Sequence, residues 1–204
     1  MQAVDGKLRL AESGANLASV LDALRDRYPE RFEMFNEALT DWFPEFDKVL
    51  FEVPGQAGLK AIALRTRDGQ YSIPVTQLSD GTRLALALLA VTWLPEPPTI
   101  VGIEEPDRGI HPRLLHKVHD ALVRLAYPEQ FGEERPPVQV IATTHSPYLV
   151  DLFKDHPEHV VIANKTGLEV TFRRLSESDE LLQELDKGPS LGEIWFSGLL
   201  GGVP

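Results

Sequence analysis

Residues 99–107 read Thr-Ile-Val-Gly-Ile-Glu-Glu-Pro-Asp, an apolar run of strand length followed by three carboxylates within four residues. Two further apolar runs follow at 138–142 and 160–163, and segments with helical character separate the three runs. Strands that alternate with helices and are continuously apolar are typical of a parallel sheet that is buried on both faces. The sequence therefore predicts an α/β fold, mainly a parallel sheet with flanking helices, to which 168–175 adds an edge strand.

The first part of the chain has a different character. Apolar side chains at helical spacing predict two helices within residues 16–43, the first capped by Asn16. Short β-like runs at 49–53, 60–66 and 70–75, with Asp68-Gly69 as a tight turn, predict an antiparallel meander. We therefore divide the chain into a helical and meander segment, 1–76, and an α/β portion, 77–204, which together are expected to form one compact domain.

Composition restricts the classes of function. The 204 residues carry 31 acidic and 20 basic side chains, for a net charge of −11, and contain no cysteine. The lack of cysteine excludes disulfides, cysteine zinc sites and cysteine nucleophiles, so histidines and carboxylates remain as candidate ligands and acid–base groups. The acidic balance argues against a broad DNA-binding surface on these residues alone. Without a membrane-length apolar run or a secretion signal, a cytoplasmic protein with no membrane association is expected.

Two strands of the predicted sheet deliver polar residues to one edge. Glu104, Glu105 and Asp107 follow the first strand, and His145 lies in the segment Thr-Thr-His-Ser that follows the second. Ligands of parallel sheets bind beyond the carboxyl ends of the strands. If the two strands are neighbours, the carboxylates and the histidine face the same cavity. For either feature alone, the start of a solvated loop is an equally good interpretation.

A third feature precedes the long apolar helix at 84–94. Ser79, Asp80, Gly81 and Thr82 stand where its first backbone N–H groups point outward with a partial positive charge. Gly81 allows an anion to approach closely, so the segment is suited to binding a phosphate. The alternative interpretation is a Ser/Asp cap on a core helix.

The order of these segments resembles that of ABC-type P-loop ATPases, most closely the RecF/SMC-like AAA ATPases. The resemblance covers residues 77–153, and the final segment resembles the same branch more weakly. In chain order the segments are similar to the signature motif (Leu78–Thr82), the Walker B strand with its glutamate (Thr99–Glu105), the D-loop (Asp107–His111), the switch histidine (Thr144–Ser146) and the terminal segment (Leu191–Gly198).

The resemblance implies ATP and Mg²⁺ as cofactors and gives three residues roles in hydrolysis. Glu105 would be the general base that polarises the attacking water, and Glu104 would take the Walker B role on Mg²⁺. His145 would contact the γ-phosphate. Glutamate at 104, where transporter-type relatives carry aspartate, agrees with the RecF-like branch.

The resemblance also implies a second ATPase subunit as partner. Ser79 and Gly81 would contact the γ-phosphate of nucleotide held by the opposite subunit, and Asp107 would lie at the dimer seam. Asp80 is an anion near this proposed phosphate site, so we expect its side chain to cap the helix and point away from the ligand. RecF-like relatives serve DNA maintenance and defence, so DNA is an implied partner of the intact protein.

A Walker A loop is missing from the sequence. The segment Gly55–Lys60 contains glycines but lacks the Gly-Lys-Ser/Thr ending and lies between strands. The simplest account is that the residues are the C-terminal part of a longer ATPase and are inactive alone. A natural half-protein that acts as a regulatory or interaction module is the alternative, and a metal-dependent phosphodiesterase built on the carboxylates and His145 is less favoured.

Other histidines carry no such interpretation. His116 and His119 are three residues apart on one predicted helix, but the apolar stripe puts His119 at its edge and His116 on the far side. His156 and His159 flank a proline in a loop. All four are interpreted as ordinary boundary or loop histidines.

Overall fold

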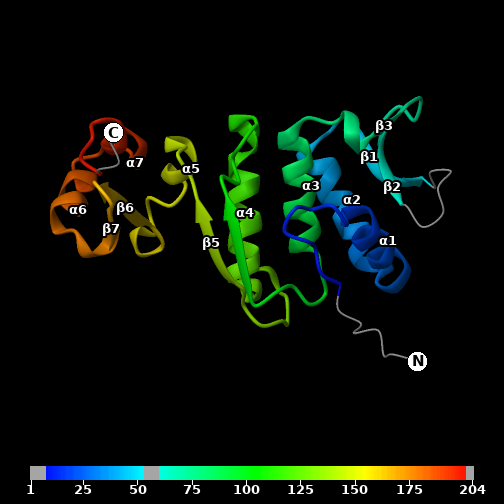
Figure 1. Cartoon of the computed structure of the whole chain (residues 1–204), viewed down its shortest axis with the longest axis horizontal. Helices are drawn as coiled ribbons and strands as arrows, with labels where there is room; N and C mark the ends of the chain where they lie inside the picture. Colours follow the sequence, from blue (N-terminus) through cyan, green and yellow to red (C-terminus); the bar gives the residue numbers. More distant parts are fainter. Residues whose placement is uncertain (1–7, 53–59, 201–204) are drawn as a thin grey trace. The chain divides into compact units, whose positions relative to one another are not determined.

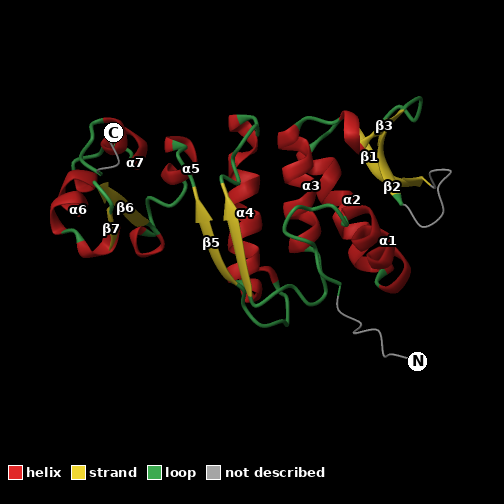
Figure 2. Cartoon of the chain, viewed as in Figure 1, coloured by secondary structure: helices red, strands yellow, loops and turns green. Residues whose placement is uncertain are grey.

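The computed structural model describes residues 8–52 and 60–200, and the chain forms two compact units, Met1–Thr143 and Thr144–Pro204 (Figures 1 and 2). The first unit contains four helices and five strands within the described residues: α1 (Leu17–Arg27), α2 (Pro29–Trp42), β1 (Phe46–Glu52), β2 (Ala61–Thr66), β3 (Ser72–Pro74), α3 (Asp80–Thr92), β4 (Ile100–Glu104), α4 (Leu115–Ala126) and β5 (Gln139–Thr143). The second contains, again within the described part, α5 (Pro147–Asp151), β6 (Val161–Thr166), β7 (Glu169–Arg174), α6 (Asp179–Asp186) and α7 (Leu191–Phe196).

The predicted antiparallel meander is confirmed as the three-stranded sheet β1-β2-β3. The β2–β3 turn is closed by Asp68, whose carboxylate accepts hydrogen bonds from the Thr66 hydroxyl at 2.6 Å and the Gln70 N–H at 3.0 Å. These hydrogen bonds, the Thr66 hydroxyl first, lower the pKa of Asp68. The glycine-bearing segment 55–59 and the predicted end of the first strand at Val53 lie outside the described residues.

Both predicted N-terminal helices are present, and they connect the meander to the rest of the first unit. Asn16 stands before α1, but its side chain does not cap that helix and instead accepts a hydrogen bond from the Ala11 N–H at 2.8 Å. The α2 helix packs on β1, where the buried Asn36 side chain accepts a hydrogen bond from the Val49 N–H at 3.1 Å. Helix α3 contacts α1, α2 and α4. Besides Thr92, one glycine and five apolar residues of α3 are buried, which confirms the deeply buried helix predicted from its composition: Gly81, Ala85, Leu86, Leu88, Leu89 and Ala90.

The parallel sheet of the first unit consists of β4 and β5. The strands pair in parallel from Ile100 opposite Gln139 to Glu104 opposite Thr143, and α4 packs against β5. The predicted α/β class, a parallel sheet with flanking helices, is thus confirmed. The expectation of strands buried on both faces is wrong for the described residues, because one face carries Ile100 and Ile141 at 58% and 55% exposure.

The third predicted strand does not join this sheet. Residues 161–166 form β6, which pairs antiparallel with β7, the strand predicted at 168–175, in a separate two-stranded sheet. The short connection explains why β6 and β7 pair antiparallel: Gly167, with φ of 63°, and Leu168 join the two strands, and so short a turn permits only antiparallel pairing. The prediction of a parallel third strand is therefore corrected.

The second unit has its own small apolar core. It joins one face of the β6–β7 hairpin to the helices through Ile162, Leu175, Leu181, Leu191, Ile194 and Leu200. The polar segment after the hairpin forms α6, of which Leu181 is the buried residue. Among the described residues of the chain, no helix combines the length and apolar character needed to cross a membrane.

A buried carboxylate fixes the end of α4 in the first unit. Glu133 is 10% exposed and accepts hydrogen bonds from Arg124 and, at 2.6 Å, from Arg135. The Arg135 guanidinium also donates to the Arg124 carbonyl at 2.7 Å. Burial raises the pKa of Glu133, but the hydrogen bonds from Arg135 and Arg124 outweigh it, so the pKa lies below its ordinary value. The carboxylate is therefore held in its ionised form.

Candidate functional site

The loop after β4 carries the three carboxylates that the sequence singles out. Glu104 is the last residue of β4 and is exposed, whereas Glu105 and Asp107 are partly buried. The Glu105 N–H donates to the Thr143 carbonyl of β5 at 2.9 Å, and the Glu105 carbonyl accepts from the Arg108 N–H at 2.8 Å. The Ile110 N–H donates to the Asp107 carbonyl at 3.1 Å. Backbone hydrogen bonds on both sides therefore hold this loop against the sheet edge.

Glu105 has an unusual backbone conformation. Its φ is 45°, and it is the one non-glycine residue with positive φ in the described part of the chain. The left-handed region costs an L-residue with a side chain on the order of 1–2 kcal/mol. Such a conformation persists only where surrounding structure enforces it, and strained residues cluster at functional sites. The hydrogen bonds to Thr143 and Arg108 provide that enforcement.

The start of α3 shows which residue caps the helix. The Ser79 hydroxyl accepts a hydrogen bond from the Thr82 N–H at 3.1 Å and lies 2.8 Å from the Thr82 hydroxyl. The Asp80 side chain is 78% exposed and pairs with Arg83 along the helix. The expectation that Asp80 caps the helix is therefore wrong, because the position before the first helical turn belongs to Ser79.

Gly81 brings α3 and the carboxylate loop together. It is buried, and a Cβ atom at this position would lie 2.0 Å from the Gly109 carbonyl oxygen and 2.4 Å from its carbon. Only a glycine leaves room for this peptide group. The sequence suggested that Gly81 makes space for an anion, and in the structure the space is filled by the Gly109 backbone. The sequence did not predict this role of Gly109, whose φ of 68° is one that glycine adopts readily.

The signature-like and D-loop-like segments share a cavity of about 260 Å³ in the first unit. The His111 imidazole, one of its walls, accepts a hydrogen bond from the Arg113 N–H at 3.2 Å. The lining comes from the end of α2, the start of α3 and the loop after β4: Trp42, Phe43, Glu45, Ser79, Gly81, Thr82, Gly109, Ile110, His111 and Leu114. The start of α3 and the loop after β4 are about thirty residues apart in the sequence and therefore form one concave surface only in the folded chain.

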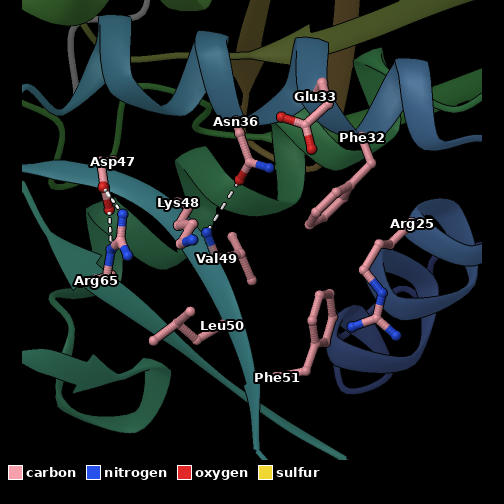
Figure 3. A pocket seen from close by; sticks show the side chains of 10 residues that line it. All are labelled: Arg25, Phe32, Glu33, Asn36, Asp47, Lys48, Val49, Leu50, Phe51 and Arg65. Carbon is pink, nitrogen blue, oxygen red and sulfur yellow. Dashed lines mark hydrogen bonds and ion pairs between the residues drawn. The ribbon is translucent and has the colours of Figure 1, made fainter. Parts of the chain in front are cut away.

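A larger cavity, about 560 Å³, lies between α1, α2 and β1 and contains none of the motif residues (Figure 3). Two pairs of its polar groups contact one another: Asp47 pairs with Arg65, and Asn36 accepts from the Val49 backbone. The Arg65 hydrogen bond lowers the pKa of Asp47. The Arg25 guanidinium lies 4.3 Å from the centre of the Phe51 ring. These contacts fasten the helices to the meander, so we assign this cavity a structural role.

His145 belongs to the second unit and is exposed. Its ring stacks on Trp195 of α7, with ring centres 6.4 Å apart and planes inclined by 25°. Helix α7 packs on α5: the Gly192 N–H donates to the Asp151 carboxylate at 2.6 Å, and a Cβ on Gly192 would lie 2.8 Å from the Pro147 side chain. The weakly matching terminal segment therefore supports the segment that carries His145. The placement of His145 at a shared site with the carboxylates stays a prediction.

The fold is that of known SMC ATPase heads. The chain matches a solved structure from work on ATP-driven dimerization and DNA-stimulated activation of SMC ATPases with a TM-score of 0.51 and 15% identity, over 83% of this chain and 99% of that one. It also matches an SMC head bound to the C-winged helix domain of ScpA, with a TM-score of 0.51 and 16% identity, over 78% of this chain and half of that one. At such identities the likeness concerns the fold alone. The likeness therefore shows an α/β fold of the kind found in SMC ATPase heads.

The family follows from the sequence. Residues 5–151 match the family described as "AAA domain, putative AbiEii toxin, Type IV TA system", and the chain belongs to this AAA-domain family. No curated protein sequence matches the chain. The matched region includes the meander, α3, the carboxylate loop and α5, so the family assignment covers every motif except the terminal segment.

Proposed function

We propose that these residues form the signature, Walker B and switch-histidine part of an ATP-hydrolysing enzyme of the ABC/RecF-like kind. The 204 residues contain no Walker A loop, which normally cradles the α- and β-phosphates. Hydrolysis therefore requires that loop from outside these residues, and the chain alone is expected to be inactive.

The conformation of Glu105 is the observation that carries the proposal. A residue that only begins a solvated loop has no reason to remain in the left-handed region at φ of 45°. Two backbone hydrogen bonds keep Glu105 there, directly after the strand that ends in Glu104. Fixed placement of a carboxylate suits phosphoryl transfer, because positioning and charge stabilisation provide most of the catalysis.

The carboxylates take separate roles in this proposal. Glu105 accepts the proton of the attacking water, and Glu104 contributes to holding Mg²⁺. The donor set fits that ion, since Mg²⁺ prefers oxygen ligands and commonly binds through one or two carboxylates plus substrate phosphates. When bound, Mg²⁺ would neutralise the charge that develops on the phosphate oxygens. His145 donates a hydrogen bond to the γ-phosphate.

The start of α3 serves the opposite subunit of a nucleotide-sandwich dimer. Ser79 and the backbone of Gly81 contact the γ-phosphate of ATP held by that subunit, where the helix N-terminus favours an anion. Asp107 lies at the seam. Because Gly81 packs against Gly109, movement of the carboxylate loop in one subunit is transmitted to the start of its own helix α3, which faces the opposite subunit. Asp80, exposed and paired with Arg83, stays off the phosphate.

The exposed face of the parallel sheet supports an added lobe. Parallel sheets are normally covered on both faces, whereas this two-stranded sheet has Ile100 and Ile141 at more than half exposure. A Walker A-bearing lobe, from the same protein or from a partner subunit, would cover this face and supply the missing loop.

The test is Glu105→Gln in the enzyme that has a Walker A lobe, either in one chain or added to these residues in trans. We expect turnover to be lost while MgATP binding remains and the nucleotide-bound dimer persists longer, as measured by phosphate release and light scattering. The matched control is Glu129→Gln, an exposed glutamate in the turn after α4, which should hydrolyse ATP normally. Unchanged turnover in Glu105→Gln would remove the basis for the proposal.

The two other functions considered give different outcomes. A regulatory half-protein predicts no Walker A reading frame upstream of Met1 and no nucleotide-dependent dimer of the complemented enzyme. A metal-dependent phosphodiesterase predicts cleavage of nucleic acid by the chain alone with divalent metal and without ATP. DNA binding by the intact protein is a further proposal, which the net charge of −11 does not support.

A further inference from the structure

Three potential metal ligands converge in the loop between α5 and β6, outside every motif described above. His156, Glu158 and His159 offer ligand atoms that all lie within 4.8 Å of one another. The His156 Nδ1 atom lies 3.1 Å from the Glu158 Oε1 atom, and the His159 Nε2 atom lies 3.8 Å from that same oxygen. From the sequence, His156 and His159 were interpreted as ordinary loop histidines.

The backbone fixes this convergence. Pro157, Glu158 and His159 form a short 3₁₀ helix in which the Pro157 ring sets the first backbone angle. Three residues per turn bring positions 156 and 159 to the same side, and the two rings stack with centres 5.1 Å apart. The His159 N–H donates to the His156 carbonyl at 2.9 Å.

Contacts to the hairpin anchor the same turn from outside. Arg174 of β7 donates to the Glu158 carbonyl at 3.0 Å, and the Leu175 N–H donates to the Val160 carbonyl at 2.9 Å. These contacts hold the main chain of the turn, so a metal would mainly need to order three exposed side chains. The positive charge of the Arg174 guanidinium disfavours binding of a metal cation nearby, and the negative charge of the Glu158 carboxylate offsets this repulsion.

We propose that His156, Glu158 and His159 bind a divalent transition metal ion, with Zn²⁺ as the expected ion. Two imidazole nitrogens and one carboxylate oxygen form a three-ligand zinc set that leaves the fourth position to water. In a tetrahedral site with bonds of about 2.1 Å, ligand atoms lie about 3.4 Å apart, close to the two separations measured here.

This site differs in chemistry from the proposed Mg²⁺ site. Imidazole ligands favour Zn²⁺, Cu²⁺ or Ni²⁺, whereas Mg²⁺ prefers oxygen and water. Excess Mg²⁺ should therefore leave Zn²⁺ binding unchanged. Binding at this site needs no nucleotide and no Walker A loop, so its test is independent of the proposed ATPase function.

The experiment is calorimetric titration of Zn²⁺ into the full chain without a histidine tag, in the presence of excess Mg²⁺. We expect one equivalent of Zn²⁺ to bind. His156→Asn or His159→Asn should raise the dissociation constant at least about tenfold, since each removes one of three ligands. Glu158→Gln should raise it as well. His116→Asn, which removes an exposed histidine on α4, is the matched control and should bind as the wild type does.

A second measurement identifies the ligands. Co²⁺ in place of Zn²⁺ should give the visible absorption of a tetrahedral site, and this should disappear in the double variant of His156 and His159. Circular dichroism of the metal-free variants verifies that the fold is intact, as expected for exposed side chains. Absence of Zn²⁺ binding by the wild type, or binding of equal strength by the double variant, would overturn the proposal.

Discussion

Replacing Gly81 with alanine tests the contact that joins α3 to the carboxylate loop. The new Cβ atom would lie 2.0 Å from the Gly109 carbonyl oxygen, whereas carbon–oxygen contacts lie near about 3.3 Å, so a shift of about 1.3 Å is required. The obstructing atoms belong to the main chain and cannot rotate away. Overpacking of this kind costs about 1–3 kcal/mol, and the helix preference of alanine returns at most about 1 kcal/mol.

We therefore expect Gly81→Ala to lower the free energy of unfolding by about 1–2 kcal/mol. The assay is urea denaturation followed by tryptophan fluorescence in a Trp195→Phe background. The remaining tryptophans, Trp42 and Trp93, both belong to the first unit, so the signal reports that unit alone.

The matched control is Gly102→Ala in β4, the strand that leads into the same loop. A Cβ on Gly102 meets no atom within 4 Å, so this variant should be as stable as the parent or more stable by about 0.5 kcal/mol. If Gly81→Ala unfolds at the same urea concentration as Gly102→Ala, the close approach of Gly81 and Gly109 does not exist in solution. The inferred link between the two segments would then be refuted.

Three further substitutions test other features. Glu105→Gly should raise the free energy of unfolding by about 1 kcal/mol by relieving the positive φ, while abolishing turnover in the complemented enzyme; a less stable variant in urea denaturation would contradict the strain. Glu133→Gln should cost about 2 kcal/mol at neutral pH. The folded-state pKa of Glu133 is lowered, so the carboxylate stabilises the fold above its ordinary pKa of 4.5, and this stabilisation is lost as pH falls through the folded-state pKa. The free energy of unfolding should therefore fall less steeply with acid in the variant, as measured by unfolding at successive pH values. Gly192→Ala, whose Cβ would lie 2.8 Å from Pro147, should speed hydrogen exchange of the α5 and α7 amides, and unchanged exchange would exclude that packing.

The predictable part of the fold consisted of elements with local signals. The meander was indicated by alternating strands and by Asp68-Gly69, and α3 by an apolar run behind Ser79. The parallel pairing of β4 and β5 followed from two apolar strands with a helix between them. Local hydrogen-bonding rules and side-chain periodicity are sufficient for each of these, because the information lies within one or two consecutive elements.

The errors had different causes, two of them local and one dependent on which segment covers the sheet. The third strand was assigned to the parallel sheet, but its hydrogen bonds go to β7, its neighbour across a two-residue turn. The sequence predicted that Asp80 caps α3, whereas Ser79 does so; serine and aspartate both cap helices, and these two residues are adjacent. Continuous apolar character suggested strands covered on both faces, although composition does not identify the segment that provides the cover.

The sequence by itself determined the motif order, the family type and which side chains are chemically able to act on a phosphate. Only the tertiary structure decided that Gly81 packs on the Gly109 peptide, that Glu105 stands at a positive φ, and that His156, Glu158 and His159 converge. The physical reason is that residue type specifies what a group can bind. Backbone geometry and long-range packing specify where that group is held and which other groups lie next to it.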